Sequence, residues 1–498
     1  MAITVDEALL RAIATKDKQI SDGRTLATKG AFTGTGQADD GGLVWGDCHG
    51  SAVYHVSVDL AAAPPVVRCT CPVKPPPCKH ALGLLVLLMT RPGAFAVGTP
   101  PADLAEKRAK SAERAEKRAE VAAKPRVVNK QALDKKTAEQ REALDLLEGL
   151  LVDLAGGGLG QVDAARAQRL ADQARQLTDA YLKGASFALQ RLASLAAGPR
   201  GPRDAFTLGH EAGEGLPPAE RETLMMRHLT RLWAIVRKGR KYLEAKLEPG
   251  EQVSDSDATL EELLGHDWKL VELKERGLVR ENVELVEVAF ERHDDTVRGE
   301  RVEESWLADL SDGQVYVDRH MRPLAALERV RGGQSFDAHL TVREAGIYPG
   351  FVNRRIRWEI GAHTERGLAP ADRERLHARA HPTIEAAVAR YKDQVKNPLA
   401  PDDAVVLVRA ADVQRVGGSS ALALVDASGA RLRLEDSPIA PARTTSNLAQ
   451  AAGARLVGGR LAQPATLAVR LYLGLADGAV RGQALALIGA AEHVRLGM

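Results

Sequence analysis

Three of the four cysteines in the chain lie within ten residues of one another, and a histidine follows two residues later. The pattern is Cys69-x-Cys71, a spacer of six residues, and then Cys78-x-His80. Three thiolates and one imidazole make up a tetrahedral donor set that structural zinc uses in proteins. We therefore predict that Cys69, Cys71, Cys78 and His80 bind one structural Zn²⁺.

The local chain geometry needed to bring these four side chains together follows from their spacing. On an extended segment, residues two apart point to the same side, so Cys69 and Cys71 can hold one ion. In a helix, residues two apart diverge by about 200°. We therefore expect Cys78 just before a helix and His80 in its first turn, because the stretch 81–89 consists mostly of good helix formers.

Three other interpretations of the cysteine cluster stay open at this point. Buried free thiols would need no regular spacing, yet the spacing here matches a ligand pattern. A catalytic zinc keeps an open coordination position, and four protein ligands leave none. A thiol redox pair does not explain the presence of His80. We therefore favour structural zinc.

A candidate β-hairpin precedes the cysteines, with strands over 43–48 and 52–59. In the second strand Tyr54, Val56 and Val58 alternate with polar residues, which is the period-two pattern of a half-buried strand. Its apolar face can pack on the leucine-rich helix. The core of such a small unit is thin, so we expect metal ligation to supply much of its folding free energy.

Residues 43–88 resemble the SWIM zinc finger, whose motif is C-x-C, a spacer of variable length and C-x-H. The matching positions are the four predicted ligands, and the flanking stretches 44–51 and 78–85 are similar to bacterial SWIM-finger proteins in particular. The resemblance implies a ββα zinc module that binds DNA or other proteins. It also implies association with a MoxR-type AAA+ ATPase and a von Willebrand A domain protein.

The rest of the chain changes character in steps. Residues 101–141 contain twelve Lys and Arg against seven Asp and Glu, a net charge of +5, and predict a solvated helical linker. Leucines then recur at helical spacing, and strand-like alternation begins after about residue 255. We predict an α+β multidomain fold in five parts: a zinc module over 1–95, a basic helical linker over 96–141, a helical domain over 142–250, an α+β region over 255–398 and a β-rich region over 399–498.

Two sets of basic residues are candidate contacts for nucleic acid or another partner: Arg68, Lys74 and Lys79 around the cysteines, and Arg237, Lys238, Arg240 and Lys241 further on. The second set also contains Gly239, a candidate helix C-cap, and cations near a helix C-terminus stabilise it without any partner. The spacer between the cysteines holds only one basic residue, and the net charge of the whole chain is only +2. We therefore expect a protein partner first and DNA second.

Motifs of the common catalytic classes are missing from the sequence. It has no P-loop, no H-E-x-x-H and no G-x-S-x-G. His377 and His381 form an i, i+4 pair on a helix predicted over 370–394, and we interpret them as surface histidines rather than a metal pair. We predict a non-enzymatic adaptor. The alternatives are an enzyme acting on nucleic acid, or its subunit, with the finger as targeting module, and a scaffold subunit stable only in a larger assembly.

Composition also indicates in which cellular compartment to expect the protein. The longest apolar run, 81–89, is far shorter than the about 20 residues that cross a bilayer. Four cysteines in 498 residues do not make a disulfide-stapled scaffold. We therefore expect a cytoplasmic protein with no membrane partner.

Overall fold

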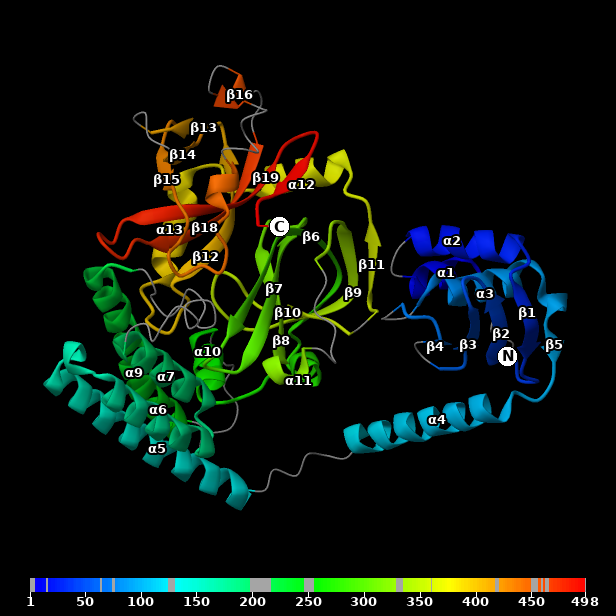
Figure 1. The fold of residues 1–498 in the computed structure, drawn as a ribbon, viewed down its shortest axis with the longest axis horizontal. Helices are drawn as coiled ribbons and strands as arrows, with labels where there is room; N and C mark the ends of the chain where they lie inside the picture. Colours follow the sequence, from blue (N-terminus) through cyan, green and yellow to red (C-terminus); the bar gives the residue numbers. More distant parts are fainter. Residues whose placement is uncertain are drawn as a thin grey trace. The chain divides into compact units, whose positions relative to one another are not determined.

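The chain folds into two compact units (Figure 1). Unit 1 is Met1–Val128 with two short stretches, Leu340–Arg343 and Glu359–Gly367, and unit 2 is the remainder. The predicted division into five parts stays a prediction. The computed structural model describes residues 5–14, 17–62, 65–73, 77–123, 130–197, 216–245, 255–327, 335–359, 361–416, 421–448, 456–457, 460–461 and 465–497.

Unit 1 contains a five-stranded sheet that includes the predicted hairpin. The hairpin is formed by β2 (Leu43–His49) and β3 (Val53–Asp59), which pair antiparallel with Asp47 opposite His55. The other strands are β1 (Phe32–Gln37), β4 (Val66–Cys69) and β5 (Ala96–Val97), and the order across the sheet is β4-β3-β2-β1-β5.

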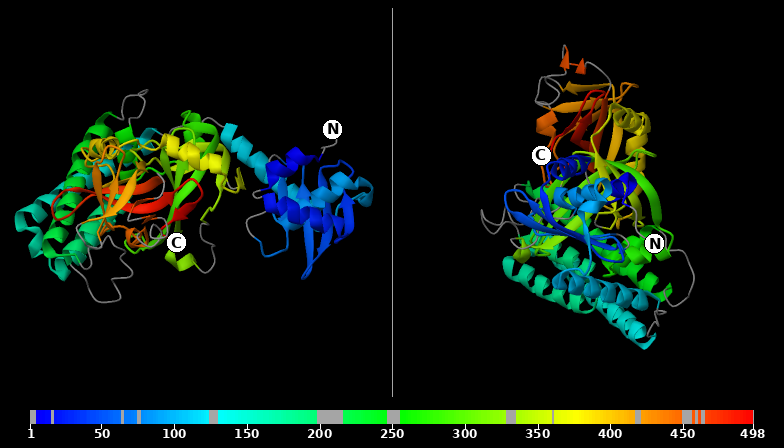
Figure 2. Two further views of the ribbon diagram at one scale, coloured as in Figure 1. Left: turned by 90° about the horizontal axis from the view of Figure 1, so that it is seen from above. Right: turned by 90° about the vertical axis from the view of Figure 1, so that its right-hand side faces the viewer.

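Three helices lie against one face of this sheet: α1 (Glu7–Ile13), α2 (Asp17–Thr28) and α3 (Lys79–Thr90) (Figures 1 and 2). Helix α3 is the predicted leucine-rich helix, and its residues from His80 to Leu88 are all buried. Helices α2 and α3 meet at two glycines, since a Cβ added to Gly23 would lie 2.8 Å from the backbone nitrogen of Gly83. The sequence analysis did not predict α1, α2 or β1.

Helix α4 (Ala102–Ala123) forms most of the predicted charged linker. Lys110 and Glu106 form an i, i+4 ion pair on its exposed surface. Near its start Arg108 binds Asp40 at 2.9 Å and the buried Asp59 at 3.5 Å. The first half of α4 is therefore held to the sheet of unit 1, at β3 and the loop before β2, rather than standing free as a spacer.

Unit 2 begins with helices α5 (Lys130–Gly157), α6 (Ala164–Asp179), α7 (Lys183–Ala197) and α9 (Pro218–Ala245), which share one apolar core (Figures 1 and 2). The predicted leucine stripe on α5 is buried in that core. Two short helices follow, α10 (Asp255–Leu263) and α11 (Leu270–Glu275).

Gly239 does not cap a helix, contrary to the sequence-based expectation. Helix α9 continues through Gly239 to Ala245, and Gly239 is buried. A Cβ at this position would lie 3.1 Å from Leu144 of α5. The glycine allows α5 and α9 to approach closely, which sequence alone does not distinguish from a helix end.

The first sheet of unit 2 is curled. Its long strands are β6 (Val279–Asp295), β7 (Glu300–Asp309), β8 (Val315–Pro323) and β9 (His339–Ile347), with the shorter β10 (Ile356–Arg357); residues 340–343 of β9 and the short β11 (His363–Arg366) are the stretches that count with unit 1. The order is β10-β9-β6-β7-β8 with β11 paired to β9, and a bridge between Val317 and Arg355 brings the two edges together. Strands β7 and β8 form an antiparallel hairpin in the region where strand-like alternation was predicted, with Gly313 in its turn at a φ of +75°.

The second sheet of unit 2 holds the strands predicted in the β-rich region. The order is β12-β18-β19-β15-β14-β13, with β20 also paired to β19. Its inner face shares one apolar core with α13 (Ile384–Gln394). The strands are β12 (Asp403–Ala410), β13 (Asp412–Arg415), β14 (Leu422–Val425), β15 (Arg431–Leu434), β18 (Ala465–Leu473), β19 (Val480–Ile488) and β20 (His493–Arg495), and β16 (Leu456–Val457) pairs with β17 (Arg460–Leu461) in a separate ribbon.

The single helix predicted over 370–394 is two helices, α12 (Pro370–Arg379) and α13. Pro382 breaks the helix, because the residue before a proline is driven towards extended backbone, and the Thr383 hydroxyl then accepts from the Ala386 amide at 3.2 Å to cap α13. His377 lies in the last turn of α12, with its ring 2.9 Å from the Thr466 hydroxyl, whereas His381 lies beyond the helix. The two histidines therefore do not share a helix face.

None of the helices in the described part of the chain is both long enough and apolar enough to span a membrane.

Candidate metal centre

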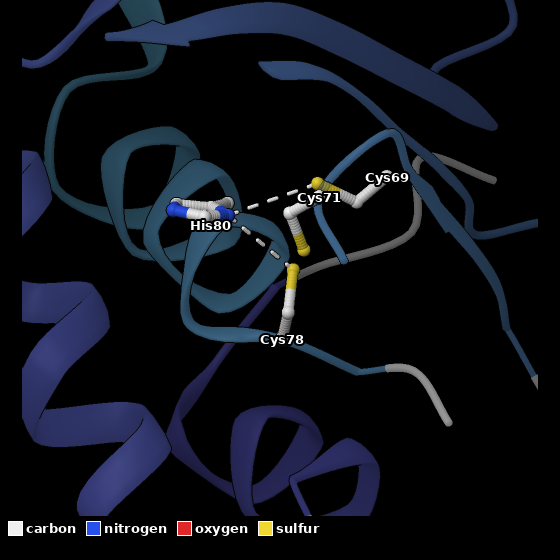
Figure 3. A group of neighbouring side chains, drawn as sticks. All are labelled: Cys69, Cys71, Cys78 and His80. Atoms are coloured by element: carbon white, nitrogen blue, oxygen red, sulfur yellow. Dashed lines mark hydrogen bonds between the residues drawn. The ribbon is translucent and has the colours of Figure 1, made fainter. Parts of the chain in front are cut away.

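The structure brings the four predicted zinc ligands to one point (Figure 3). Cys69 is the last residue of β4, Cys71 lies in the bend that follows, Cys78 is the N-cap of α3 and His80 is in the first turn of that helix. One donor atom from each residue lies within 4.8 Å of all the others. Among the described residues, no other group of three or more His, Cys, Asp or Glu side chains meets this criterion.

The spacing of the donor atoms fits a tetrahedral zinc ion. The Nδ1 atom of His80 is 3.8 Å from the Sγ of Cys69 and 3.8 Å from the Sγ of Cys78. Zinc bonds of about 2.3 Å to sulfur and about 2.0–2.1 Å to nitrogen place tetrahedral ligand atoms about 3.5–3.8 Å apart. The four side chains therefore need only small shifts to share one ion.

Burial of this cluster favours a bound cation once more than one of its cysteines is deprotonated. Cys71 and Cys78 are each 2% exposed and His80 is 5% exposed, while Cys69 is half-buried. Several thiolates held this close in a low-dielectric site repel one another unless a positive charge lies between them. A bound Zn²⁺ supplies that charge and closes the loop between β4 and α3.

The thiols differ in acidity for reasons visible in the structure. A hydrogen bond donated by the Cys69 thiol, together with backbone amides of Ala81 and His80 at the start of α3, lowers the pKa of Cys78 to about 5. Cys78 is therefore a thiolate near neutral pH, the form that binds metal. Burial raises the pKa of the remaining cysteine, Cys48, to about 11, so that side chain stays a neutral thiol outside the cluster.

Tyr54 of β3 positions the histidine ligand. Its ring stacks on the His80 imidazole with the centroids 4.6 Å apart and the planes at 21°. The Tyr54 hydroxyl lies 2.8 Å from the Ser51 hydroxyl, which fixes the far end of the ring. The sequence placed Tyr54 on the apolar face of its strand but did not assign it to the site. The available signal was that Tyr54 shares a strand face with Val56 and Val58, and this face was expected to pack against α3.

We expect Tyr54→Ala to lower zinc affinity by about tenfold, because groups that orient a metal ligand contribute on this scale. Tyr54→Phe keeps the stacked ring and should bind zinc as the unaltered protein does. Competition with a chromophoric chelator measures both affinities. Equal affinity in the alanine variant and the unaltered protein would show that the stack does not position His80.

A scan against protein-family models supports the same conclusion. Residues 54–88 match the SWIM zinc finger. The match begins at the strand that carries Tyr54 and ends in α3, so it contains all four ligands; we call residues 54–88 the SWIM finger. Searches of curated proteins and of solved structures found no match to the chain. The SWIM match and the Cys3His cluster together indicate one structural Zn²⁺.

The basic residues predicted near the SWIM finger take different positions. Arg68 is half-buried on β4, opposite Ser57 of β3, and Lys79 is exposed at the first position of α3. Lys74 lies outside the described residues. Two of the three predicted cations are thus placed on the segments that carry the zinc ligands.

The second basic set lies on α9 in unit 2. The Arg240 guanidinium binds the carboxylates of Asp145 and Glu148, and Lys238 donates to the side-chain oxygen of Asn397 at 2.9 Å. Arg237 and Lys241 are exposed. The acidic partners of Arg240 weaken the positive field of this set, and its role in binding nucleic acid stays a prediction.

Proposed function

We propose that the protein is a non-enzymatic adaptor whose SWIM finger is organised by one structural zinc and binds a macromolecular partner, a protein in the first place. The observation that carries this proposal is the closed donor set. Cys69, Cys71, Cys78 and His80 fill four coordination positions, which leaves no place for a reactive water. The finger therefore supplies a shaped surface rather than a reaction centre.

The surface of the SWIM finger favours a protein partner over DNA. Its described cations at the zinc site are Arg68 and Lys79, and sequence-independent DNA binding usually needs several phosphate contacts. Two apolar side chains are also exposed by about half, Val73 of the SWIM finger at 47% and Val53, the residue just before the finger, at 49%. Exposed apolar side chains next to polar ones are typical of protein interfaces.

The resemblance noted in the sequence gives the partner class. We propose a MoxR-type AAA+ ATPase and a von Willebrand A domain protein as partners, in a bacterial cytoplasm. The zinc does not contact the partner in this proposal. It holds β4 and α3 in the arrangement that the partner binds.

Binding of the full-length protein to the purified AAA+ ATPase and to a DNA duplex, each measured at low and high salt, tests the proposal. We expect binding to the ATPase to change little with salt and to be lost in Cys69→Ser. DNA binding should be weak and should fall steeply with salt. The double variant Arg68→Gln/Lys79→Gln removes the described cations near the zinc site while keeping the ligands.

The result that contradicts a protein partner is equally specific. Tight DNA binding that is lost in Arg68→Gln/Lys79→Gln, with no binding to the ATPase, would make DNA the partner. Binding to the ATPase that survives in Cys69→Ser would place the contact outside the finger.

A further inference from the structure

Unit 2 contains a cavity of about 1020 Å³ that the adaptor function does not use. It lies at the end of the curled sheet where β6 begins, β7 turns into β8 and β9 ends, with α13 forming another wall. Small-molecule sites are typically about 300–1,000 Å³ and often lie where strand ends and helices meet. The cavity is thus large enough for an organic ligand.

The lining of this cavity is rich in guanidinium groups. Four arginines and two aspartates, Asp312 and Asp393, line the cavity, and two of the arginines are ion-paired, Arg276 with Glu272 and Arg280 with Asp309 and Asp312. Guanidinium groups bind phosphate and carboxylate oxygens in a bidentate manner, and several of them together favour a doubly charged group. The four arginines are Arg276, Arg280, Arg354 and Arg390.

Two of these arginines are held in place by side chains of unit 2. Arg280 donates to the Tyr316 hydroxyl at 2.8 Å and lies 3.0 Å from the buried carboxylate of Asp309. Arg276 stacks on the Trp268 ring at 4.6 Å. Guanidinium groups fixed in this way lose less conformational entropy when a ligand binds.

The other two arginines, Arg354 and Arg390, line the cavity from two different segments, the chain that follows β9 and helix α13. The Arg390 guanidinium donates to a neutral acceptor, the side-chain oxygen of Gln314. Although the Arg390 side chain is exposed, partial desolvation and the charge of Arg354 lower its pKa, and Asp312 partly offsets this. An anion bound between Arg354 and Arg390 would relieve the repulsion between these two charges, so the free cavity is electrostatically prepared for negative charge.

The rest of the wall is apolar. Leu278, Ile347 and Phe351 line the cavity together with the Tyr316 ring. The segment that carries Phe351 is fixed to α13, because the buried side chain of Gln394 accepts from the Val352 amide at 2.9 Å. Apolar walls with a few converging polar groups fit an organic body that carries one charged group.

We propose that this cavity binds a small organic phosphate, with its phosphate dianion between Arg354 and Arg390 and its apolar body against Phe351. A phosphomonoester carries about two negative charges near neutral pH, one for each of the two guanidinium groups that line this part of the cavity. A polynucleotide would need a continuous basic track, whereas the exposed Asp312 and Asp393 would repel successive phosphates.

Calorimetric titration of the full-length protein with phenyl phosphate at about pH 8, where the ester is a dianion, tests the proposal. We expect binding of phenyl phosphate to be tighter than that of benzenesulfonate, a monoanion of similar shape. The double variant Arg354→Gln/Arg390→Gln should weaken the binding of phenyl phosphate by about tenfold or more. Both residues are exposed, so the variant should melt as the unaltered protein does. Lys392→Gln removes an exposed charge from the same helix outside the cavity and is the matched control.

A second variant separates the two parts of the ligand. Phe351→Ala should lower the affinity for phenyl phosphate but leave the affinity for inorganic phosphate unchanged. The proposal is overturned by absent binding of phenyl phosphate up to about 10 mM, or by equal affinity in the double-arginine variant and in Lys392→Gln. Tighter binding of a ten-residue thymidine oligonucleotide at the same arginines would overturn the assignment to a small ligand.

Discussion

Cys69→Ser is expected to abolish zinc binding by the full-length chain and to unfold unit 1 while unit 2 stays folded. Structural zinc sites contribute on the order of 10 kcal/mol to the folding of small domains, and the core of unit 1 packs directly on α3. Elemental analysis should give one zinc per chain for the unaltered protein and none for the variant. Hydrogen exchange should show loss of amide protection in β2, β3 and α3 but not in the strands of unit 2.

Cys48→Ala is the matched control for the zinc ligand variant. Cys48 is fully buried on β2 but lies outside the donor cluster. We expect its alanine variant to keep one zinc and the protection of α3, with only the modest destabilisation of a small core truncation. Full zinc content in Cys69→Ser, or loss of zinc in Cys48→Ala, would contradict the ligand set.

Arg470→Met is expected to destabilise unit 2 by about 3–5 kcal/mol, because it leaves a buried carboxylate without its cation. Arg470 on β18 donates to both carboxylate oxygens of Glu291 on β6, and the two side chains are 3% and 1% exposed. The Trp306 indole also donates to Glu291 at 2.9 Å, and Arg470 lies 2.9 Å from Asp403. This buried network connects the two sheets of unit 2.

Chemical denaturation that follows the unfolding of unit 2 measures the effect of Arg470→Met. Arg433→Met, on β15 of the same sheet, breaks an exposed pair with Glu435 and should cost less than about 1 kcal/mol. Glu291→Met/Arg470→Met should recover part of the loss, because neither member is then left charged without the other. If Arg470→Met and Arg433→Met shift the denaturation midpoint equally, the buried pair does not hold the sheets together.

Elements whose signals are local in the chain could be predicted from the sequence. The hairpin over 43–59, helix α3 and the hairpin over 301–318 all have alternating or helical apolar patterns bounded by turn residues. The zinc ligands belong to the same class, because Cys69 and His80 lie only eleven positions apart and their spacing alone determines the chelate geometry. The α+β multidomain fold class was confirmed for this reason.

Features that depend on contacts between distant segments could not be predicted. Gly23 and Gly83 permit close packing of α2 on α3, and Gly239 does the same for α9 on α5, yet a glycine in a sequence more often indicates a turn or a helix end. The stacking of Tyr54 on His80 depends on the placement of β3 against α3. The cavity of unit 2 is built from four segments between residues 276 and 394, which no local pattern connects.

Zinc K-edge X-ray absorption of the full-length protein tests the central claim most directly, because it counts the atoms bound to the metal. We expect three sulfur atoms at about 2.3 Å and one nitrogen at about 2.0–2.1 Å. A first shell with two or fewer sulfur atoms, or a folded unit 1 in protein that contains no zinc, would contradict the account.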